Sequence, residues 1–317
     1  MKYRILLTGK NGQVGAELAA LLPRLGEVTA YDHHQLDLSK PDQIRRAIRD
    51  TRPHVIVNAA AYTFVDQAES EECEARVINA DAPALLAEEA KRIGAALVHY
   101  STDYIFDGSK NLPYDENDPA NPINVYGKTK LAGEQAIQDA GLPHLIFRTA
   151  WVYSTRGRNF LLTILRLATQ REELRIACDQ FGAPTWSREI AKGTARILAQ
   201  LFEQGQEAFS RSSGIYHMTA AGETSWFEFA KAILEEASRT SRGVSWFVAA
   251  TGGHPLVARL VTPVTTEEYP TLARRPAYSV LSNSRLKHMF DSELPHWRTQ
   301  LHLAFAESQV KDQSIDP

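Results

Sequence analysis

The sequence predicts an α/β fold in which a doubly wound parallel sheet is joined to a smaller mixed α/β lobe. Short β-rich runs alternate with helical patterns over the first half of the chain, as in repeated βαβ units. Most of these runs are continuously apolar, as expected for strands that are buried on both faces. After about residue 150 the alternation loosens, and 317 residues are enough for about two average domains.

The same patterns place the individual elements. Apolar residues at helical spacing predict the helices; we expect Ser39 to cap the second helix and Gly94 to end the third. The predicted strands are 3–8, 28–31, 54–58, 96–101 and 145–149, with shorter ones at 174–177 and 215–217. The predicted helices are 14–22, 41–50, 82–93, 159–170, 187–204 and 225–236.

Composition excludes several classes of protein. Hydrophobic residues make up 44% and charged residues 23%, the usual mixture of a folded, water-soluble chain. The net charge of -3 argues against nucleic-acid binding through a basic surface. No apolar run approaches the ~20 residues that span a bilayer, and the N-terminal residues resemble a strand more than a signal peptide. Two cysteines are too few for a disulfide framework, so we expect a cytoplasmic protein without a membrane partner.

A glycine-rich segment, Gly-Lys-Asn-Gly-Gln-Val-Gly at 9–15, directly follows the first predicted strand and leads into a helix. Glycines let the backbone turn tightly and approach a pyrophosphate, whose charge is favoured at a helix N-terminus. Alternatively, the glycines only allow a tight turn of the backbone and bind no ligand. Asp32 lies about 20 residues further on, where a carboxylate can bind ribose hydroxyls. We therefore predict dinucleotide binding by residues 1–150, with contacts from Gly9, Asn11, Gly12, Gln13, Val14, Gly15 and Asp32.

Further cofactor contacts are expected after the second and third strands. Asp37 and Leu38 are expected to lie near the adenine. Alternatively, they only lead into the Ser39 cap of the next helix. Ala60, Ala61 and Tyr62 follow the third strand, where small residues let a cofactor lie against the edge of the sheet. Close packing of helix on strand is the alternative explanation for these small residues.

A second group of residues carries the predicted chemistry. Tyr126 and Lys130 form a Tyr-x-x-x-Lys pair on one face of the helix before the fifth strand. The fourth strand ends at Thr102 and Asp103, so a hydroxyl reaches the same edge of the sheet. These residues suit hydride transfer to a ketone, because negative charge grows on the carbonyl oxygen and must be met by a proton.

Each of the three residues has a predicted role in that reaction. Tyr126 can donate the proton, and a nearby Lys130 ammonium would lower the tyrosine pKa from its usual value near 10 while holding the nicotinamide ribose. Thr102 would hydrogen-bond the carbonyl oxygen and orient it. The cofactor is expected to be NADH or NADPH; the acidic Asp32 favours NADH.

Long motifs resemble the extended short-chain dehydrogenase/reductases and, among them, the dTDP-4-dehydrorhamnose reductases. Besides the glycine-rich segment, they include Asn-Ala-Ala-Ala-Tyr-Thr at 58–63, Ser-Thr-Asp-Tyr-Ile-Phe-Asp-Gly at 101–108 and Tyr-Gly-Lys-Thr-Lys-Leu-Ala-Gly-Glu at 126–134. The resemblance continues with Arg-Thr-Ala-Trp-Val-Tyr at 148–153, Gln-Phe-Gly-Ala-Pro-Thr at 180–185, and Arg275, Pro276 and Ser279.

The resemblance implies a Rossmann-like dinucleotide domain and a substrate-binding lobe at 151–317, with segments of 174–217 returning to the first domain. It implies that Thr102, Tyr126 and Lys130 are catalytic, that Trp151 packs on the sugar, and that Asp103 also contacts substrate. The implied reaction is NAD(P)H-dependent reduction of the 4-keto group of dTDP-4-dehydro-6-deoxy-L-mannose to dTDP-L-rhamnose. That product would place the chain in the synthesis of a surface polysaccharide such as O-antigen.

The resemblance leaves some alternatives open. Some relatives bind magnesium through glutamates at a dimer interface; Glu17 and Glu189 lie near the corresponding places, although surface glutamates are the simpler interpretation. A homodimer is possible on the same ground. Other functions compatible with the motifs are a reductase or epimerase acting on another sugar nucleotide, and a non-catalytic, cofactor-binding regulatory subunit resembling the β subunit of methionine adenosyltransferase.

Overall fold

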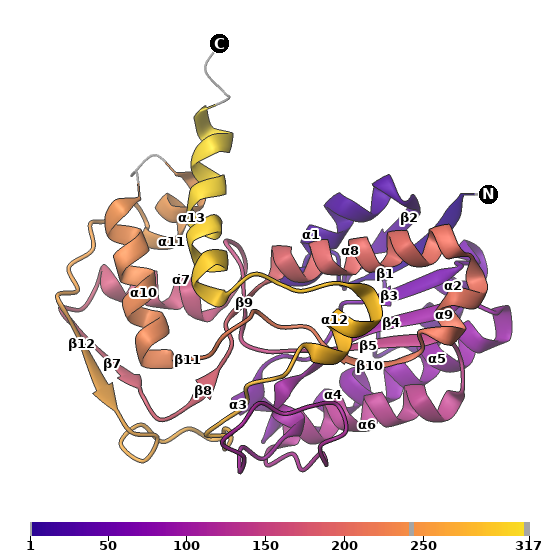
Figure 1. Ribbon diagram of the computed structural model, residues 1–317, viewed down its shortest axis with the longest axis horizontal. Helices are drawn as coiled ribbons and strands as arrows, with labels where there is room; N and C mark the ends of the chain where they lie inside the picture. Colours follow the sequence, from indigo (N-terminus) through magenta and orange to yellow (C-terminus); the bar gives the residue numbers. More distant parts are fainter. Residues whose placement is uncertain (1, 241–243, 314–317) are drawn as a thin grey trace.

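The computed structural model describes residues 2–240 and 244–313, which form two lobes lying side by side (Figure 1). The larger lobe is built on a six-stranded sheet in which every neighbouring pair of strands is parallel. The first strand lies inside the sheet, and the chain winds outward from it in both directions, which confirms the predicted doubly wound α/β fold. The strand order is β10 (Gly214–His217), β5 (His144–Thr149), β4 (Ala96–Thr102), β3 (Val55–Asn58), β1 (Tyr3–Thr8) and β2 (Gly26–Tyr31).

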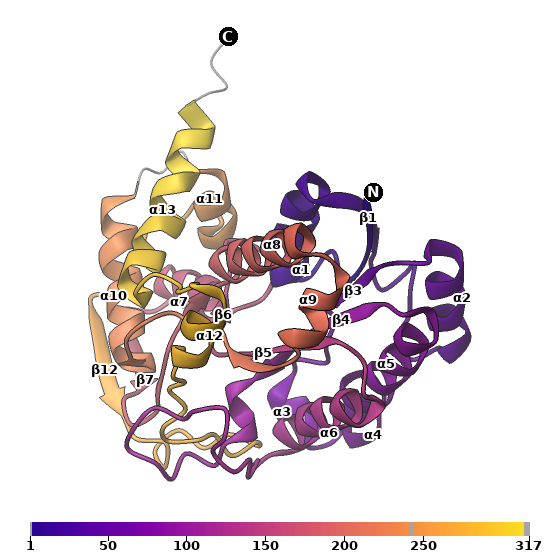
Figure 2. The ribbon, with the colours of Figure 1, turned by 45° about the vertical axis from the view of Figure 1, so that its right-hand side comes forward.

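Helices cover both faces of this sheet (Figure 2). One face is covered by α1 (Gln13–Leu21) and α8 (Ser187–Gln204), and the other by α2 (Pro41–Thr51), α5 (Ala82–Ile93) and α6 (Val125–Ala140). Shorter helical elements of this lobe are η1 (Leu22–Arg24), α3 (Val65–Ala68), α4 (Glu72–Arg76), η2 (Val77–Asp81), η3 (Asp103–Ile105), α9 (Gln206–Arg211) and α12 (Ser284–Phe290).

The smaller lobe is mostly helical and has its own core. Its helices are α7 (Phe160–Ala168), α10 (Trp226–Arg239), α11 (Ser245–Thr251) and α13 (Trp297–Gln313). Three two-stranded ladders accompany them: β7 (Glu173–Ala177) with β12 (Leu260–Val264), β8 (Phe181–Gly182) with β11 (Thr224–Ser225), and β6 (Val152–Tyr153) with β9 (Thr185–Trp186).

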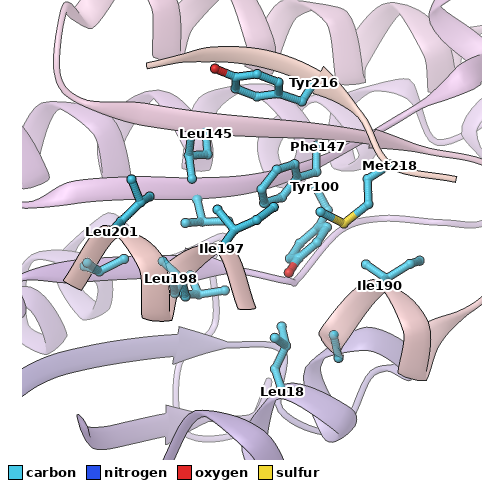
Figure 3. Close-up of a cluster of buried hydrophobic side chains, with 14 of the residues drawn as sticks. Leu18, Tyr100, Leu145, Phe147, Ile190, Ile197, Leu198, Leu201, Tyr216 and Met218 are labelled. Carbon is cyan, nitrogen blue, oxygen red and sulfur yellow. The ribbon is translucent and has the colours of Figure 1, made fainter. Parts of the chain in front are cut away.

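Alternation along the strands produces two apolar layers. On the α1 and α8 face, Phe147 and Leu145 of β5 pack against Ile197 and Leu201 of α8, as the close-up in Figure 3 shows. The opposite face packs α5 and α6 against aliphatic side chains of β1, β3, β4 and β5. Because both faces are covered, polar groups of these strands are exposed mainly beyond the strand ends, and that is where the candidate site lies.

One local prediction needs correction. Lys40, not Ser39, is the N-cap of α2 and it makes no side-chain capping bond; the Ser39 hydroxyl instead donates to Asp37 Oδ1 at 2.7 Å. β10 lies in the large sheet beside β5, in agreement with the strand expected at 215–217 and with the expected return of this part of the chain to the first domain. The expected end of α5 is found, since Gly94 adopts φ +68°. Among the described residues, no helix combines the length and the apolar character needed to cross a membrane.

Candidate active site

The glycine-rich turn between β1 and α1 is too closely packed for side chains. Gly9 has φ +69°, and a Cβ on it would lie 2.8 Å from the Ala60 nitrogen. A Cβ on Gly15 would lie 2.0 Å from the Gly9 carbonyl oxygen, inside van der Waals contact. Gly12 caps α1 without a side-chain acceptor, so no capping side chain covers the first N–H groups of that helix. The turn therefore leaves backbone donors accessible at a helix N-terminus.

This arrangement fits the pyrophosphate of a dinucleotide. The first turn of α1 contains no acidic residue that would repel an anion. The side-chain oxygen of Gln13 is buried without a hydrogen-bond partner in the described part of the chain, while Val14 packs partly against the core. Asn11 reaches across to Asp32, with its amide nitrogen 3.5 Å from Oδ2. Gln13 and the uncapped amides thus offer polar groups to a bound ligand.

Asp32 lies just beyond β2 in an ordered turn. Its Oδ1 accepts hydrogen bonds from the backbone N–H groups of His34 and Gln35, and the Lys10 ammonium is 3.5 Å from its Oδ2. Partial desolvation raises the pKa of Asp32, but the Gln35 N–H and the Lys10 charge outweigh it and lower the pKa. Asp32 is therefore a fixed carboxylate with a cation beside it.

The other predicted cofactor residues do not all face the glycine-rich turn. Ala60 packs directly against Gly9, and Ala61 follows it half-buried. Leu38, in contrast, belongs to the core beneath α2, and the Asp37 carboxylate accepts from Ser39. The backbone N–H of Tyr62 donates to the Asn79 side chain, and its hydroxyl to Glu71 at 2.5 Å.

The predicted catalytic residues meet where β4 ends and α6 begins. Thr102 is the last residue of β4, and its hydroxyl oxygen accepts the Tyr104 N–H at 3.1 Å. Asn124 starts α6 by accepting the Gly127 N–H, which places Tyr126 in the first turn. A Cβ on Gly127 would lie 2.1 Å from the Tyr104 carbonyl oxygen, so glycine lets the helix approach η3 closely.

Burial shifts the pKa values of both Tyr126 and Lys130. Burial raises the pKa of Tyr126 to about 12; the Thr102 hydroxyl lowers it and the Asp103 charge raises it. The predicted lowering of this pKa by Lys130 is therefore wrong for the structure described. The Lys130 side-chain nitrogen donates instead to the Tyr100 carbonyl at 2.6 Å, and burial lowers the pKa of Lys130 to about 8. Tyr126 is thus fully protonated at neutral pH and able to donate.

Asp103 is enclosed by protein. Its Oδ2 accepts from the Ser279 hydroxyl at 2.5 Å and its Oδ1 from Thr102 at 3.2 Å. Burial raises its pKa to about 7, although both hydroxyls lower it. The late segment that contains Ser279 is held to the large lobe a second time by Arg275, which forms an ion pair with Asp66 at 2.7 Å. Asp103 thus links the end of β4 to the other lobe.

Trp151 has an unusual backbone for a bulky residue, with φ +46°. Its indole stacks on Trp226 with ring centroids 3.5 Å apart and an angle of 5° between the planes. A Cβ on Gly182 would lie 2.4 Å from the Trp151 ring, so glycine is required beside it. No local sequence pattern around Trp226 indicates an aromatic partner 75 positions earlier.

Two glutamates were expected at the surface, with magnesium ligation as the alternative. Both are buried: Glu17 is 6% exposed and Glu189 is 9% exposed. Arg188 lies 3.0 Å from Glu17, and Lys192 lies 2.8 Å from Glu189. Within residues 2–240 and 244–313 no group of three or more His, Cys, Asp or Glu side chains is arranged to hold a metal ion. These pairs explain the two carboxylates without magnesium.

Comparison with known proteins gives long matches. The family model described as the RmlD substrate binding domain matches residues 2–310. A dTDP-4-dehydrorhamnose reductase of Burkholderia thailandensis is 51% identical over 295 residues, which are 93% of this chain and 95% of that protein. The enzyme of the same name from Escherichia coli K12 is 43% identical over 298 residues, covering 93% of this chain and 94% of the relative.

Solved structures agree with these relatives. The crystal structure of dTDP-4-dehydrorhamnose reductase from Bacillus anthracis in complex with NADP has a TM-score of 0.83 and 35% identity, covering 97% of this chain and all 100% of that one. A UDP-glucose 4-epimerase from Thermus thermophilus in complex with NAD has a TM-score of 0.75 at 20% identity and covers 96% of this chain and 99% of its own, so it shares the fold alone. From the family model and the two close relatives, we conclude that the chain belongs to the dTDP-4-dehydrorhamnose reductase family.

Proposed function

We propose that this protein uses NADPH or NADH to reduce the 4-keto group of dTDP-4-dehydro-6-deoxy-L-mannose, forming dTDP-L-rhamnose. The observation that carries this proposal is the convergence of Thr102, Tyr126 and Lys130 at one edge of a dinucleotide fold, in a chain 51% identical to a reductase of that name. We place the cofactor on residues 1–150 with the returning α8 and β10, and the sugar nucleotide against residues 151–317.

The side chains at the site divide the work of reduction. A bound reduced nicotinamide would supply the hydride. The Tyr126 hydroxyl, protonated because burial raises its pKa to about 12, donates a proton to the carbonyl oxygen as negative charge develops there. Thr102 hydrogen-bonds the same oxygen and orients it. Lys130 is positioned one helical turn from Tyr126, where we expect it to hold the nicotinamide ribose.

Cofactor preference is proposed to depend on the pair of Lys10 and Asp32. A carboxylate alone would bind ribose hydroxyls and repel a 2′-phosphate, but Lys10 lies 3.5 Å from that carboxylate and adds a compensating charge. Both cofactors are therefore accommodated, and the relative from Bacillus anthracis was crystallised with NADP. His33 and His34 lie exposed in the same turn.

Lys10→Ala is expected to weaken NADPH binding by roughly tenfold, the effect of losing one charge-assisted hydrogen bond, and to change NADH binding less than about twofold. Fluorescence titration of each cofactor measures both dissociation constants. Lys231→Ala, which removes a lysine charge from α10, is the matched control. Equal weakening of the two cofactors would show that Lys10 does not recognise the 2′-phosphate.

Trp151→Ala is expected to raise the KM for the sugar nucleotide by about tenfold or more while the KM for the cofactor changes little, because the stacked pair in the smaller lobe loses one ring. Steady-state kinetics with each substrate varied in turn checks this. Trp151→Phe keeps an aromatic face and should recover most of the loss. A larger change in the cofactor KM would move Trp151 out of the sugar site.

The direct test follows absorbance of the reduced nicotinamide when the purified protein is mixed with dTDP-4-dehydro-6-deoxy-L-mannose and either cofactor. We expect stoichiometric oxidation of NADPH or NADH. Cofactor binding without oxidation would favour the regulatory-subunit alternative or another sugar nucleotide. Addition of EDTA should leave the rate unchanged, because Glu17 and Glu189 already have cationic partners. Light scattering of the same sample tests the homodimer.

A further inference from the structure

Three polar side chains form a row across the sheet beneath the catalytic edge. Thr8, Asn58 and His99 are register partners on β1, β3 and β4. Two positions before each of them on the same strand, an aliphatic side chain is buried in the core that α5 and α6 cover. Thr8 and Asn58 are 1% exposed and His99 is 0% exposed. Polar groups so deeply buried are costly unless they are hydrogen-bonded, so their partners are informative.

The row is linked by hydrogen bonds and ends at the catalytic lysine. The Thr8 hydroxyl donates to Asn58 Oδ1 at 2.6 Å. Asn58 Nδ2 lies 3.1 Å from His99 Nδ1, and Nε2 on the other side of the ring lies 3.2 Å from Lys130 Nζ. One continuous path therefore joins the strand that precedes the glycine-rich turn to Lys130.

The positions of the protons in this row follow from one backbone group. The Ala60 N–H points at the Asn58 side chain, 3.3 Å from Oδ1, and a backbone N–H can only donate. Oxygen must therefore occupy that position, which leaves the Asn58 NH₂ group facing His99 Nδ1. Nδ1 is then the acceptor, so neutral His99 carries its proton on Nε2, directed at Lys130.

This tautomer of His99 can form a hydrogen bond with Lys130 only when the lysine is a neutral amine. An ammonium group has three donors and no acceptor, so a charged Lys130 and the Nε2–H of His99 would face each other as two donors. A neutral amine has a lone pair that accepts from Nε2–H, and it still donates to the Tyr100 carbonyl. The hydrogen bonds of the row are all satisfied when Lys130 is neutral.

We propose that His99 is a positioning residue which presents a hydrogen-bond donor to Lys130 and so favours its neutral amine, letting the lysine gain and lose a proton within the working range of pH. The catalytic consequence rests on the proposed function. Reduction of a ketone consumes one proton from solvent, since hydride and proton together give the alcohol. Once Tyr126 has given its proton, an exchanging Lys130 can bring a replacement to the site.

The surroundings of Lys130 agree with this assignment. The side chain is 1% exposed, and burial lowers its pKa to about 8 even though the Glu134 carboxylate raises it. That carboxylate is itself held by Arg148 at 2.7 Å, which limits its effect on the lysine. Titratable and charged groups near this part of α6 include His99 of β4, which contacts Lys130, and Asp103 and Tyr104 of η3, which lie close to Tyr126. Glu134, one turn further along the helix, is paired with Arg148 of β5.

The test is a pH titration of Lys130 by NMR in protein labelled with ¹³C-lysine, without substrate. The Lys130 signal is identified by its absence in Lys130→Met. We expect a midpoint of about pH 8 in the wild-type protein. His99→Gln should raise it by about one unit or more, because the amide can turn its oxygen toward an ammonium group. His144→Gln, the same substitution at the start of β5, should leave the midpoint unchanged.

An unchanged midpoint in folded His99→Gln would overturn the proposal, whether or not the protein proves to be the proposed reductase. If that variant does not fold, Asn58→Asp takes its place. Its carboxylate still accepts from Thr8 and Ala60 but cannot donate to His99, so the ring proton moves to Nδ1 and Nε2 can accept from an ammonium. The midpoint should rise here too, and a midpoint that stays or falls would contradict the assigned tautomer.

A kinetic readout separates this role from a merely structural one. The pH dependence of kcat/KM reports ionisations of the free enzyme. Its fall on the basic side should move upward together with the NMR midpoint in His99→Gln. A uniform loss of kcat/KM at every pH, with no displacement of the basic limb, would show that His99 only supports the fold.

Discussion

Tyr126→Phe is expected to lower kcat by several hundredfold or more while NADPH binding stays within about twofold of the wild-type value. Removal of a positioned proton donor typically costs 10²- to 10⁴-fold in rate. The structure is consistent with Tyr126 as the proton donor, because burial raises its pKa to about 12 and keeps its proton in place at neutral pH. Stopped-flow measurement of cofactor oxidation in a single turnover reports the chemical step directly.

Tyr104→Phe is the matched control for this experiment. Its ring lies edge-on to that of Tyr126, with centroids 6.0 Å apart, so the substitution removes a neighbouring hydroxyl and leaves the proposed donor intact. We expect a much smaller loss of rate than in Tyr126→Phe. Turnover near the wild-type rate in Tyr126→Phe would remove that residue from the role of acid.

Local sequence patterns predict most of the large lobe. β1 and α8 begin and end where the patterns place them, because apolar residues at strand or helix spacing need a buried face and both elements have one. The helical segments between Val65 and Asp81 have no such signal. They are polar and short, and they are held by tertiary contacts such as the Asn79 side chain, which bonds the backbone of Tyr62 in both directions.

In the candidate site, too, motifs within one segment could be predicted, whereas contacts between segments far apart in the sequence could not. The glycine-rich turn and the Tyr-x-x-x-Lys pair lie within single βα segments, where spacing alone indicates geometry. The bond between Asp103 and Ser279 joins residues 176 positions apart, and no pattern around either residue indicates it. The sequence around His99 does not indicate its contacts, because its partners on β1 and β3 are recognised only when the register is known.

Replacement of Lys130 is the second large effect that we expect. Lys130→Met should lower kcat by about a hundredfold or more, because the proposed replacement of the Tyr126 proton through Lys130 is lost. It should also weaken cofactor binding, because the expected contact with the nicotinamide ribose is lost. Kinetics and fluorescence titration measure the two losses. Lys128→Met, two residues earlier on α6 with an exposed side chain, is the matched control and should retain the activity.

Thermal unfolding of Lys130→Met separates catalysis from stability. Burial lowers the Lys130 pKa to about 8, below that of an unfolded lysine. Between pH 8 and about 10 the unfolded chain therefore binds more protons than the folded one, so the free energy of unfolding of the wild-type protein should rise with pH in this window. The Met variant lacks this group, and its free energy of unfolding should rise less over the same window.

At pH 7, where the charge is buried at a cost, the variant should unfold at the same temperature as the wild-type protein or higher. A clearly lower unfolding temperature would mean that Lys130 supports the fold, and that its loss of activity reports damage to the structure instead of missing chemistry.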